Sequence, residues 1–191
     1  MLDKYSPDTP ATVIGNSSGA IVSLKLLSRH APKIRTLFCY EPPAARFLPD
    51  FDSLWKTHEE TYALYRARGM FPALMKFTEL TQSDPRMVQA FMDFEKPFLF
   101  SNLQYWFERE FMTYPQAEFD VERELEPSKG KLVLVNGELS PKGAYQYRGN
   151  VALAGMLGQE VVVFPGEHVG HATHAEAFAG KLVKVLKERE G

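Results

Sequence analysis

One short segment of this 191-residue chain has the residue types of a nucleophilic site: Gly15–Gly19 reads Gly-Asn-Ser-Ser-Gly. The apolar run Thr12–Ile14 precedes it, and a helical pattern over Ala20–Arg29 follows it. A G-x-S-x-G motif on a sharp turn between a strand and a helix exposes the serine hydroxyl. The first N–H groups of the helix then lie near the attacked atom, where they can stabilise an oxyanion. The pattern therefore predicts that Ser17 is a nucleophile.

The turn itself constrains the residues that form it. We expect a strained backbone at Ser17, and we expect that a side chain at Gly15 or Gly19 would collide with the neighbouring strand or helix. A Gly/Ser-rich turn before a helix can also bind phosphate, or bind nothing, so this alternative stays open. A serine hydroxyl is a poor nucleophile on its own, which means that the site needs a base.

A histidine near the other end of the chain is the candidate base. His168 follows the apolar run Glu160–Phe164 within a turn. Such a position suits proton transfer better than core packing, although a surface histidine without a role is the alternative. His168, His171 and His174 are spaced by three residues, which turns successive side chains about 60° apart on a helix. We therefore expect no metal site there, and we place His171 and His174 at the rim of the site or at a helix N-cap.

The elements that position these residues alternate along the chain. Four segments predict strands closed by turn residues: Thr12–Ile14, Ile34–Tyr40, Lys131–Val135 and Glu160–Phe164. Three patterns predict helices: Ala20–Arg29, Tyr145–Leu157 and Ala175–Lys187. The last two strands are nearly all apolar, as strands covered on both faces must be. The alternation predicts an α/β fold with a mainly parallel sheet.

Residues 49–128 follow a different pattern, with amphipathic helices and no strand. The helices are expected to break at prolines: Pro72, Pro85, Pro97 and Pro115. Most of the aromatic residues lie here, including Trp55, Trp106, Phe91, Phe94, Phe98, Phe100, Phe107 and Phe111. Such stripes usually pack helices together, although a cap over a pocket needs both packing and ligand contact. We predict a core formed by residues 1–48 and 129–191, with 49–128 inserted as a helical cap in which His58 faces solvent.

The composition excludes several functional classes. The net charge is −2, so no nucleic-acid partner is expected, and no apolar run approaches the roughly 20 residues of a membrane span. Cys39 is the only cysteine, which excludes a disulfide framework or a multi-cysteine zinc site within one chain. We expect a cytoplasmic protein, because a reducing compartment is the simplest interpretation and the first residues do not read as a signal peptide. No nucleotide-binding motif is present, and we expect no cofactor.

With these residues in place, the sequence resembles the α/β-hydrolase superfamily, and its serine esterases in particular, over almost the whole chain. The features that carry the resemblance are the turn Gly15–Gly19, the strand end Tyr40-Glu41-Pro42-Pro43, the helical cap, the strand end Asn136-Gly137-Glu138 and the turn Pro165-Gly166-Glu167-His168. The resemblance implies that Ser17 is the nucleophile, that His168 is the general base and that the backbone N–H of Ser18 is one oxyanion donor. The implied reaction is acyl-transfer hydrolysis of an ester-like bond in a small apolar substrate.

The acid of the implied triad departs from the pattern that is usual in the superfamily. Members usually place an Asp in a Gly-x-x-Asp pattern after the strand at Lys131–Val135, where this chain has Ser140. Glu41 ends the preceding strand at the same edge of the sheet, and some members take their acid from that strand. We therefore expect Glu41 to address His168, with Glu138 as the alternative acid and a turn-capping role as the non-catalytic alternative for Glu41.

A second departure concerns the N-terminal side of the sheet. Superfamily members carry several strands before the nucleophile strand, whereas only ten residues precede Ala11 here. We therefore expect the N-terminal half of the sheet to be missing, together with the loop that usually supplies the second oxyanion donor. Activity would then depend on that missing half being supplied. Thr12–Ile14 would then be an exposed edge strand, and a homodimer would bury it. The alternative to an enzyme is a non-catalytic hydrolase-fold protein that acts in assembly.

Overall fold

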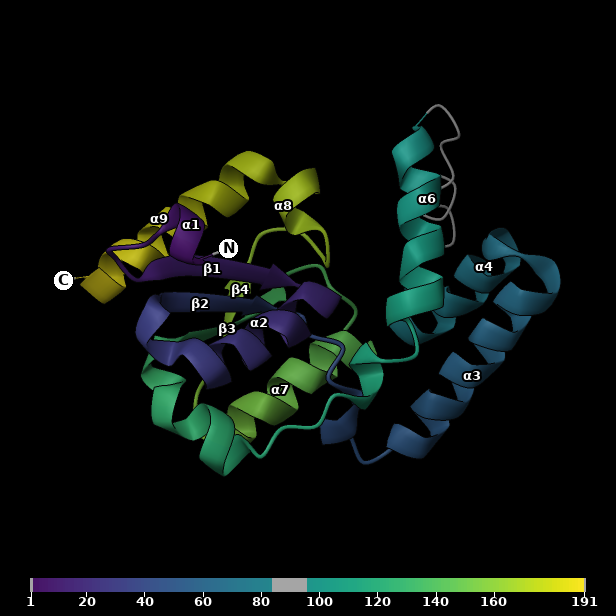
Figure 1. Cartoon of the computed structure of the whole chain (residues 1–191), viewed down its shortest axis with the longest axis horizontal. Coiled ribbons are helices and arrows are strands. Elements are labelled where there is room, and N and C mark those ends of the chain that lie inside the picture. The colour runs from purple at the N-terminus through teal and green to yellow at the C-terminus, as the bar shows by residue number, and fades with distance from the viewer. Residues whose placement is uncertain (1, 84–95, 191) are drawn as a thin grey trace.

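The computed structural model describes residues 2–83 and 96–190, and these contain a four-stranded, all-parallel sheet (Figure 1). The strands lie in chain order: β1 (Ala11–Asn16), β2 (Ile34–Tyr40), β3 (Leu132–Gly137) and β4 (Val161–Phe164). In register, Asn16 of β1 lies beside Tyr40 of β2, and Gly137 of β3 lies beside Phe164 of β4. The carboxyl ends of all four strands therefore meet at one edge of the sheet.

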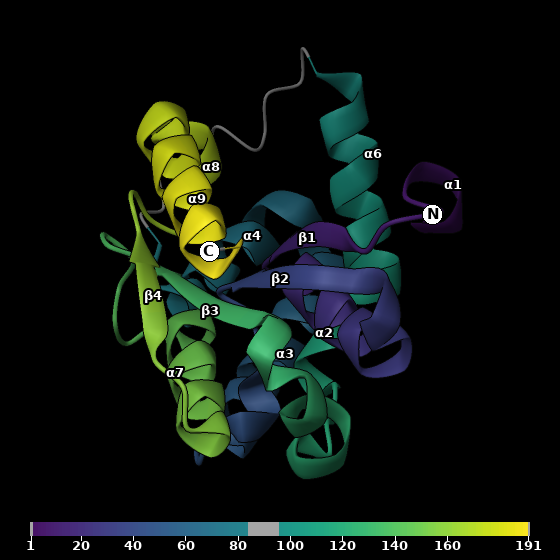
Figure 2. The ribbon, with the colours of Figure 1, turned by 90° about the vertical axis from the view of Figure 1, so that its left-hand side faces the viewer.

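Helices cover both faces of this sheet, which gives the α/β architecture expected from the sequence. Helices α2 (Ser18–His30) and α7 (Tyr145–Leu157) lie on one face, and α9 (Ala175–Glu190) lies on the other (Figures 1 and 2). Three shorter helices belong to the same part of the chain: α1 (Leu2–Tyr5), η1 (Ala31–Lys33) and α8 (Gly170–Thr173). Helix α7 begins and ends at the residues that the sequence predicts, and Gly158 terminates it with a left-handed backbone.

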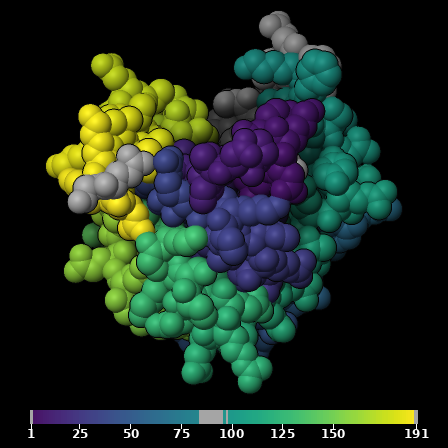
Figure 3. All heavy atoms as spheres, turned by 60° about the vertical axis from the view of Figure 1, so that its left-hand side comes forward, coloured from purple at the N-terminus to yellow at the C-terminus, as the bar shows by residue number. Residues whose placement is uncertain are grey.

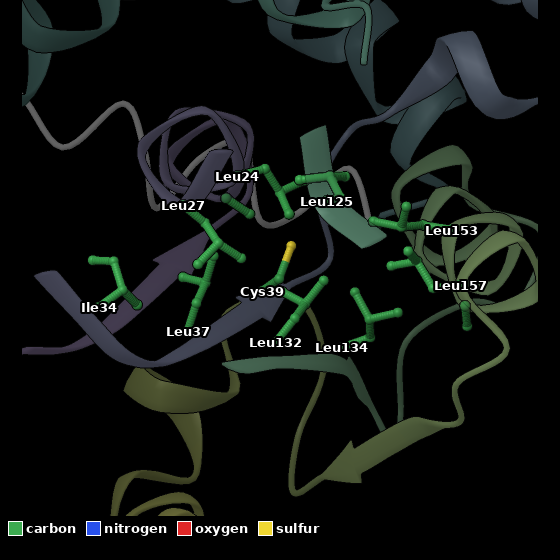
Figure 4. Packing of buried hydrophobic residues seen from close by; sticks show 12 residues of the cluster. Leu24, Leu27, Ile34, Leu37, Cys39, Leu125, Leu132, Leu134, Leu153 and Leu157 are labelled. Carbon is green, nitrogen blue, oxygen red and sulfur yellow. The ribbon is translucent and has the colours of Figure 1, made fainter. Parts of the chain in front are cut away.

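Successive side chains of β2 point to opposite faces of the sheet, and both faces are apolar. Leu37 and Cys39 face the cluster formed with α2 and α7 (Figure 4), whereas Phe38 and Tyr40 face the cluster formed with α9. All four side chains are buried. Because a parallel sheet is covered on both sides, its strands read as continuous apolar runs rather than as alternating ones. The free thiol of Cys39 is part of this core, and burial raises its pKa.

Between β2 and β3, the described residues form helices joined by turns and short loops, and they form no strand. Its elements are η2 (Ala45–Phe47), α3 (Phe51–Arg68), α4 (Met70–Thr81), α6 (Pro97–Tyr105), the π-helical turns η3 (Trp106–Glu110) and η5 (Val121–Leu125), and the 3-10 turns η4 (Tyr114–Gln116) and η6 (Glu126–Lys131). Helices α3, α4 and α6 stand to one side of the sheet (Figure 1). We use "cap" for residues 49–128, the insertion predicted above.

The helix breaks differ in part from the sequence prediction. The break between α3 and α4 falls at Gly69, whose φ of 86° a side chain rarely allows, and not at Pro72. Pro72 lies in the first turn of α4, where its missing N–H costs no helical hydrogen bond. Pro97 and Pro115 stand at helix starts as expected. The predictions for Pro85, Phe91 and Phe94 lie outside the described residues.

The prediction that His58 faces solvent is wrong. Its side chain is completely buried, and the rings of five aromatic residues surround it at centroid distances of 4.9–6.3 Å. These residues come from three cap elements, a turn and the core helix α7: Trp55, Phe77, Phe111, Tyr114 and Tyr145. A charged imidazole would be poorly solvated there, so burial lowers the pKa of His58 to about 4.

Within the described residues, β1 pairs only with β2 and forms one edge of the sheet. Ile14 on this edge is 48% exposed, and the N-terminal residues lie on the molecular surface (Figure 3). The homodimer predicted for this edge stays a prediction. No helix in the described ranges is long and apolar enough to cross a membrane.

Candidate active site

The turn after β1 holds Ser17 in a strained conformation, as the sequence predicts. Its φ of 55° and ψ of −128° lie in a region that non-glycine residues rarely adopt. The Ser17 N–H donates to the carbonyl oxygen of Tyr40 at 3.0 Å, which fixes the turn against the end of β2. Strain held in this way by neighbouring structure is common at functional sites.

The two glycines of the motif play unequal parts. A Cβ at Gly15 would lie 2.1 Å from Ser23 Oγ and 2.8 Å from the Cα of Ala20, so only glycine allows α2 to pack this closely. The same expectation for Gly19 is wrong, because a Cβ there would meet nothing within 4 Å. Gly19 is the second residue of α2 and is exposed, so it faces away from the sheet.

A buried carboxylate connects the ends of β2, β3 and the turn after β4. The Nδ1–H of His168 donates to Glu41 Oε2 at 2.7 Å, and the Gly137 N–H donates to Glu41 Oε1 at 2.8 Å. Glu41 is completely buried, so each carboxylate oxygen exchanges water for a protein donor. The carboxylate can only accept at Nδ1, which leaves Nε2 of His168 free to accept a proton.

Glu41 reaches this position through its backbone. It follows β2 directly, with a positive φ of 44°, and its N–H donates to the carbonyl oxygen of Val135 on β3. A left-handed glutamate is uncommon, and the strain is held by the buried hydrogen bonds on both sides. The turn therefore directs the carboxylate across the end of β3 toward His168.

Two further contacts position the backbone around His168. Asn16 Nδ2 donates to the carbonyl oxygen of His168 at 3.0 Å, and the Tyr40 hydroxyl donates to the carbonyl oxygen of Glu167. Burial raises the pKa of Tyr40, which keeps this hydroxyl protonated as a donor. The sequence analysis missed both residues. Asn16 ends β1 directly before Ser17, and Tyr40 ends β2 directly before Glu41, so their positions in the sequence were the available signal.

Of the remaining residues that the sequence analysis names, Ser18 lies at the site, whereas Glu138 and Ser140 make no described contact with His168. Ser18 is the first residue of α2, next to Ser17, where its N–H is one of the helix donors without an intrahelical partner. Glu138 is exposed, and no described hydrogen bond or ion pair joins it to His168. Ser140 is buried close to Gly137, and its hydroxyl has no partner among the described residues. The structure thus brings Glu41, and not Glu138, to the histidine.

Ser17 and His168 line the same cavity, which has a volume of about 330 Å³. No hydrogen bond joins Ser17 Oγ to the imidazole or to any other described residue, and such contacts often tighten only when a ligand binds. Most of the wall is apolar, and the cap contributes much of it: Leu74, Phe77, Thr78, Thr81, Ser83, Leu103 and Trp106. The core contributes the rest, namely Asn16, Tyr145, Gln146, Glu167 and Val169.

The other two histidines of the C-terminal segment, His171 and His174, contact residues close to them in the sequence. His174 Nδ1 lies 3.0 Å from the Thr173 hydroxyl, and the His171 ring packs on Phe178. In the part of the chain that the structure describes, no group of three or more His, Cys, Asp or Glu residues is arranged to hold a metal ion. The described site is built from a hydroxyl, an imidazole and a carboxylate.

Comparison with solved structures identifies the fold. The enol-lactonase of Burkholderia xenovorans superposes with a TM-score of 0.57 at 18% identity, over 97% of this chain and 69% of that one. The proline iminopeptidase of Mycobacterium smegmatis superposes with a TM-score of 0.53 at 17% identity, over 98% and 68%. The chain has the fold of the α/β-hydrolase superfamily. Identities this low establish the fold alone.

Sequence comparison adds a relative that is named as a hydrolase. The chain is 25% identical over 186 residues to a Bacillus subtilis protein named "Uncharacterized hydrolase YraK", covering 95% of this chain. It spans 65% of the length of that relative. No family model matches the chain. These findings give the chain the α/β-hydrolase fold and one relative that is itself named as a hydrolase.

Proposed function

We propose that the protein is a serine hydrolase that cleaves an ester-like bond in a small apolar substrate by acyl transfer. One observation carries the proposal: Ser17, on its strained turn, lines the same cavity as His168, whose Nδ1 is held by the buried Glu41. In a catalytic triad, such residue types act as nucleophile, base and acid, and we assign these roles to Ser17, His168 and Glu41. The hydrolase-fold relatives lend support, although a fold does not by itself fix a reaction.

The first half of the reaction forms an acyl-enzyme. Ser17 Oγ attacks the carbonyl carbon while its proton passes to Nε2 of His168. Glu41 stays ionised and stabilises the imidazolium from Nδ1. The N–H of Ser18, at the N-terminus of α2, stabilises the oxyanion. When the tetrahedral intermediate collapses, the C–O bond to the leaving alcohol breaks and the alcohol takes the proton from His168.

The second half releases the acid. Water attacks the acyl carbon, its proton passes to His168 Nε2, and the bond to Ser17 Oγ breaks as the hydroxyl regains that proton. In our proposal, residues 49–128 act as the cap that covers this cavity, since α4, α6 and η3 supply much of its wall. The apolar wall favours an alkyl or aryl group. We also propose a cytoplasmic location, on the basis of the single cysteine.

Covalent labelling tests the nucleophile directly. A fluorophosphonate probe should modify the wild-type protein at Ser17 and leave Ser17→Ala unmodified, with mass spectrometry locating the adduct. Ser18→Ala is the matched control, because it keeps the Ser18 N–H and should label normally. Labelling that survives in Ser17→Ala, or that fails in the folded wild-type protein, would favour the non-catalytic alternative.

A further inference from the structure

One residue of the cavity wall carries a buried polar atom that the proposed chemistry does not use. Gln146, the second residue of α7, is 2% exposed and lines the cavity together with Ser17. Its Nε2 donates to the carbonyl oxygen of Thr81 at 3.3 Å. Its Oε1 is buried and has no partner among the described residues.

The orientation of the Gln146 amide follows from its neighbour. A flipped amide would place Oε1 against the Thr81 carbonyl oxygen, and two acceptors would then face each other. The contact with Thr81, at the end of α4, therefore fixes Nε2 toward the cap and leaves Oε1 as the unpaired atom. A buried acceptor without a donor costs free energy, and a ligand group that satisfies it gains affinity.

The rest of the wall limits what this ligand group can be. The described residues that line the cavity include no Lys or Arg, and Glu167 is their one carboxylate. An anionic group would find no Lys or Arg among these residues, and it could not donate to Oε1. The neighbouring side chains Phe77 and Trp106 are aromatic, and both line the cavity. The wall therefore suits an apolar group that carries a neutral O–H or N–H.

We propose that Gln146 is a specificity-determining residue whose Oε1 accepts a hydrogen bond from a neutral hydroxyl or amide N–H on an otherwise apolar substrate. This inference rests on the proposed serine hydrolase, because it assigns the substrate of that same cavity. The amide is held in advance by Thr81, so little rotamer freedom is lost when the substrate binds. Sites that hydrogen-bond a substrate group discriminate strongly against analogues that lack it.

Matched esters test this assignment. The probes are p-nitrophenyl esters from phenylacetate to phenylhexanoate, and phenylalkyl acetates of the same lengths, each with and without a para-hydroxyl on the ring. The two series place the donor on either side of the scissile bond. At the best chain length, the wild-type protein should prefer the hydroxylated ester by about tenfold or more in kcat/KM.

The variants separate hydrogen bonding from packing. Gln146→Met should abolish the preference, read as the ratio of kcat/KM for the two esters, because Met fills a similar volume but accepts no such hydrogen bond. Gln146→Leu replaces it if the Met variant does not fold. Gln159→Met is the control, since Gln159 Oε1 is also buried and unpaired but lies outside the cavity wall. This control should keep the preference. A preference that survives in Gln146→Met, or that is absent from both series, would overturn the assignment.

A binding measurement keeps this inference separate from the catalytic proposal. Benzylacetone and its para-hydroxylated analogue are ketones that cannot be hydrolysed, and calorimetry measures their affinity for the Ser17→Ala protein. The hydroxylated ketone should bind about tenfold more tightly, and Gln146→Met should remove that difference. If no ester is cleaved but this difference is found, the serine hydrolase fails and the Gln146 site stands. If esters are cleaved and the ketones bind equally, the Gln146 assignment fails alone.

Discussion

Two buried titratable side chains, Glu41 at the sheet edge and His58 in the cap, differ in whether they have hydrogen-bond partners. At the carboxyl edge of the sheet, Glu41 is completely buried and both its oxygens accept hydrogen bonds. In the aromatic interior of the cap, His58 is equally buried, but neither ring nitrogen has a partner among the described residues. A buried charge needs partners, whereas a buried neutral ring needs only to stay neutral.

The difference between the two regions comes from their backbones. Parallel strands end together, so the backbone donors of one strand and the turn residues of its neighbours converge at one edge. The cap helices satisfy their own backbone groups internally and offer His58 only rings. The sheet edge can therefore hold a carboxylate in one orientation, while the cap interior holds an imidazole by packing alone. Measurements on Glu41 and His58 test this contrast, and two smaller effects test the strained turn and the open edge of the same sheet.

Glu41→Gln should lower kcat/KM for ester hydrolysis by about 10³–10⁴ while leaving the fold intact, because the amide keeps the shape but not the charge that stabilises the imidazolium. Steady-state kinetics on a p-nitrophenyl ester and a thermal melt give the two readings. Glu138→Gln is the control and should retain activity within about twofold, because its side chain is exposed. If the control loses activity and Glu41→Gln does not, the acid has been assigned to the wrong residue.

His58 should make the protein less stable in acid. The pKa of His58 in the fold is about 4, below its ordinary value of 6.5, so folding favours the neutral ring. The contribution is complete above pH 6.5 and is lost as the pH falls toward 4, by about 3 kcal/mol for a shift of this size.

Comparison with His58→Phe isolates this effect from that of the carboxylates. Urea unfolding between pH 7 and pH 4 should show a loss of stability that is about 3 kcal/mol larger in the wild-type protein than in the variant. Phe keeps an apolar ring in the aromatic cluster, so the variant should fold at neutral pH. Equal losses in the two proteins would mean that His58 finds a partner in solution.

Ser17→Gly should stabilise the fold while removing the nucleophile. Glycine adopts the φ of 55° at Ser17 without strain, which should raise the free energy of unfolding by about 1 kcal/mol. Denaturant titration measures the gain, and fluorophosphonate labelling should be lost. Ser18→Gly is the matched control, because this position is helical and glycine there should give no gain. A loss of stability in Ser17→Gly would show that the hydroxyl stabilises the turn more than the backbone strains it.

The open edge of the sheet gives the smallest expected effect on stability. We predict a homodimer that buries β1, and light scattering should report a mass near twice that of one chain. Ile14→Lys should shift the mass to the monomer and change monomer stability by no more than about 0.5 kcal/mol, since the side chain is 48% exposed. Val163→Lys on β4 is the control, with the same exposure at the opposite edge, and should keep the dimer. A monomeric wild-type protein over a wide concentration range would refute the dimer.

The sequence predicts the parts of this protein that depend on local pattern. Short apolar runs predict four strands to within two residues at each end, and Gly158 marks the end of α7. The Ser17 turn is also local, because a strand, a Gly-x-Ser-x-Gly turn and a helix allow few other conformations. The error at Gly19 shows the limit of such patterns, since a motif does not tell which glycine faces the sheet.

Only the tertiary structure decides which distant residues meet. The Glu41–His168 contact spans 127 positions, and it depends on strand register and on the positive φ of Glu41, neither of which the residue types fix. The burial of His58 depends on how α4, η4, the turn at Phe111 and α7 pack against α3, so that one face of a highly charged helix is closed off from solvent. The unpaired oxygen of Gln146 carries no sequence signal at all. Local propensity determines the elements of this protein, whereas the packing between them determines which polar groups find partners, because pairing depends on distances that only the folded chain sets.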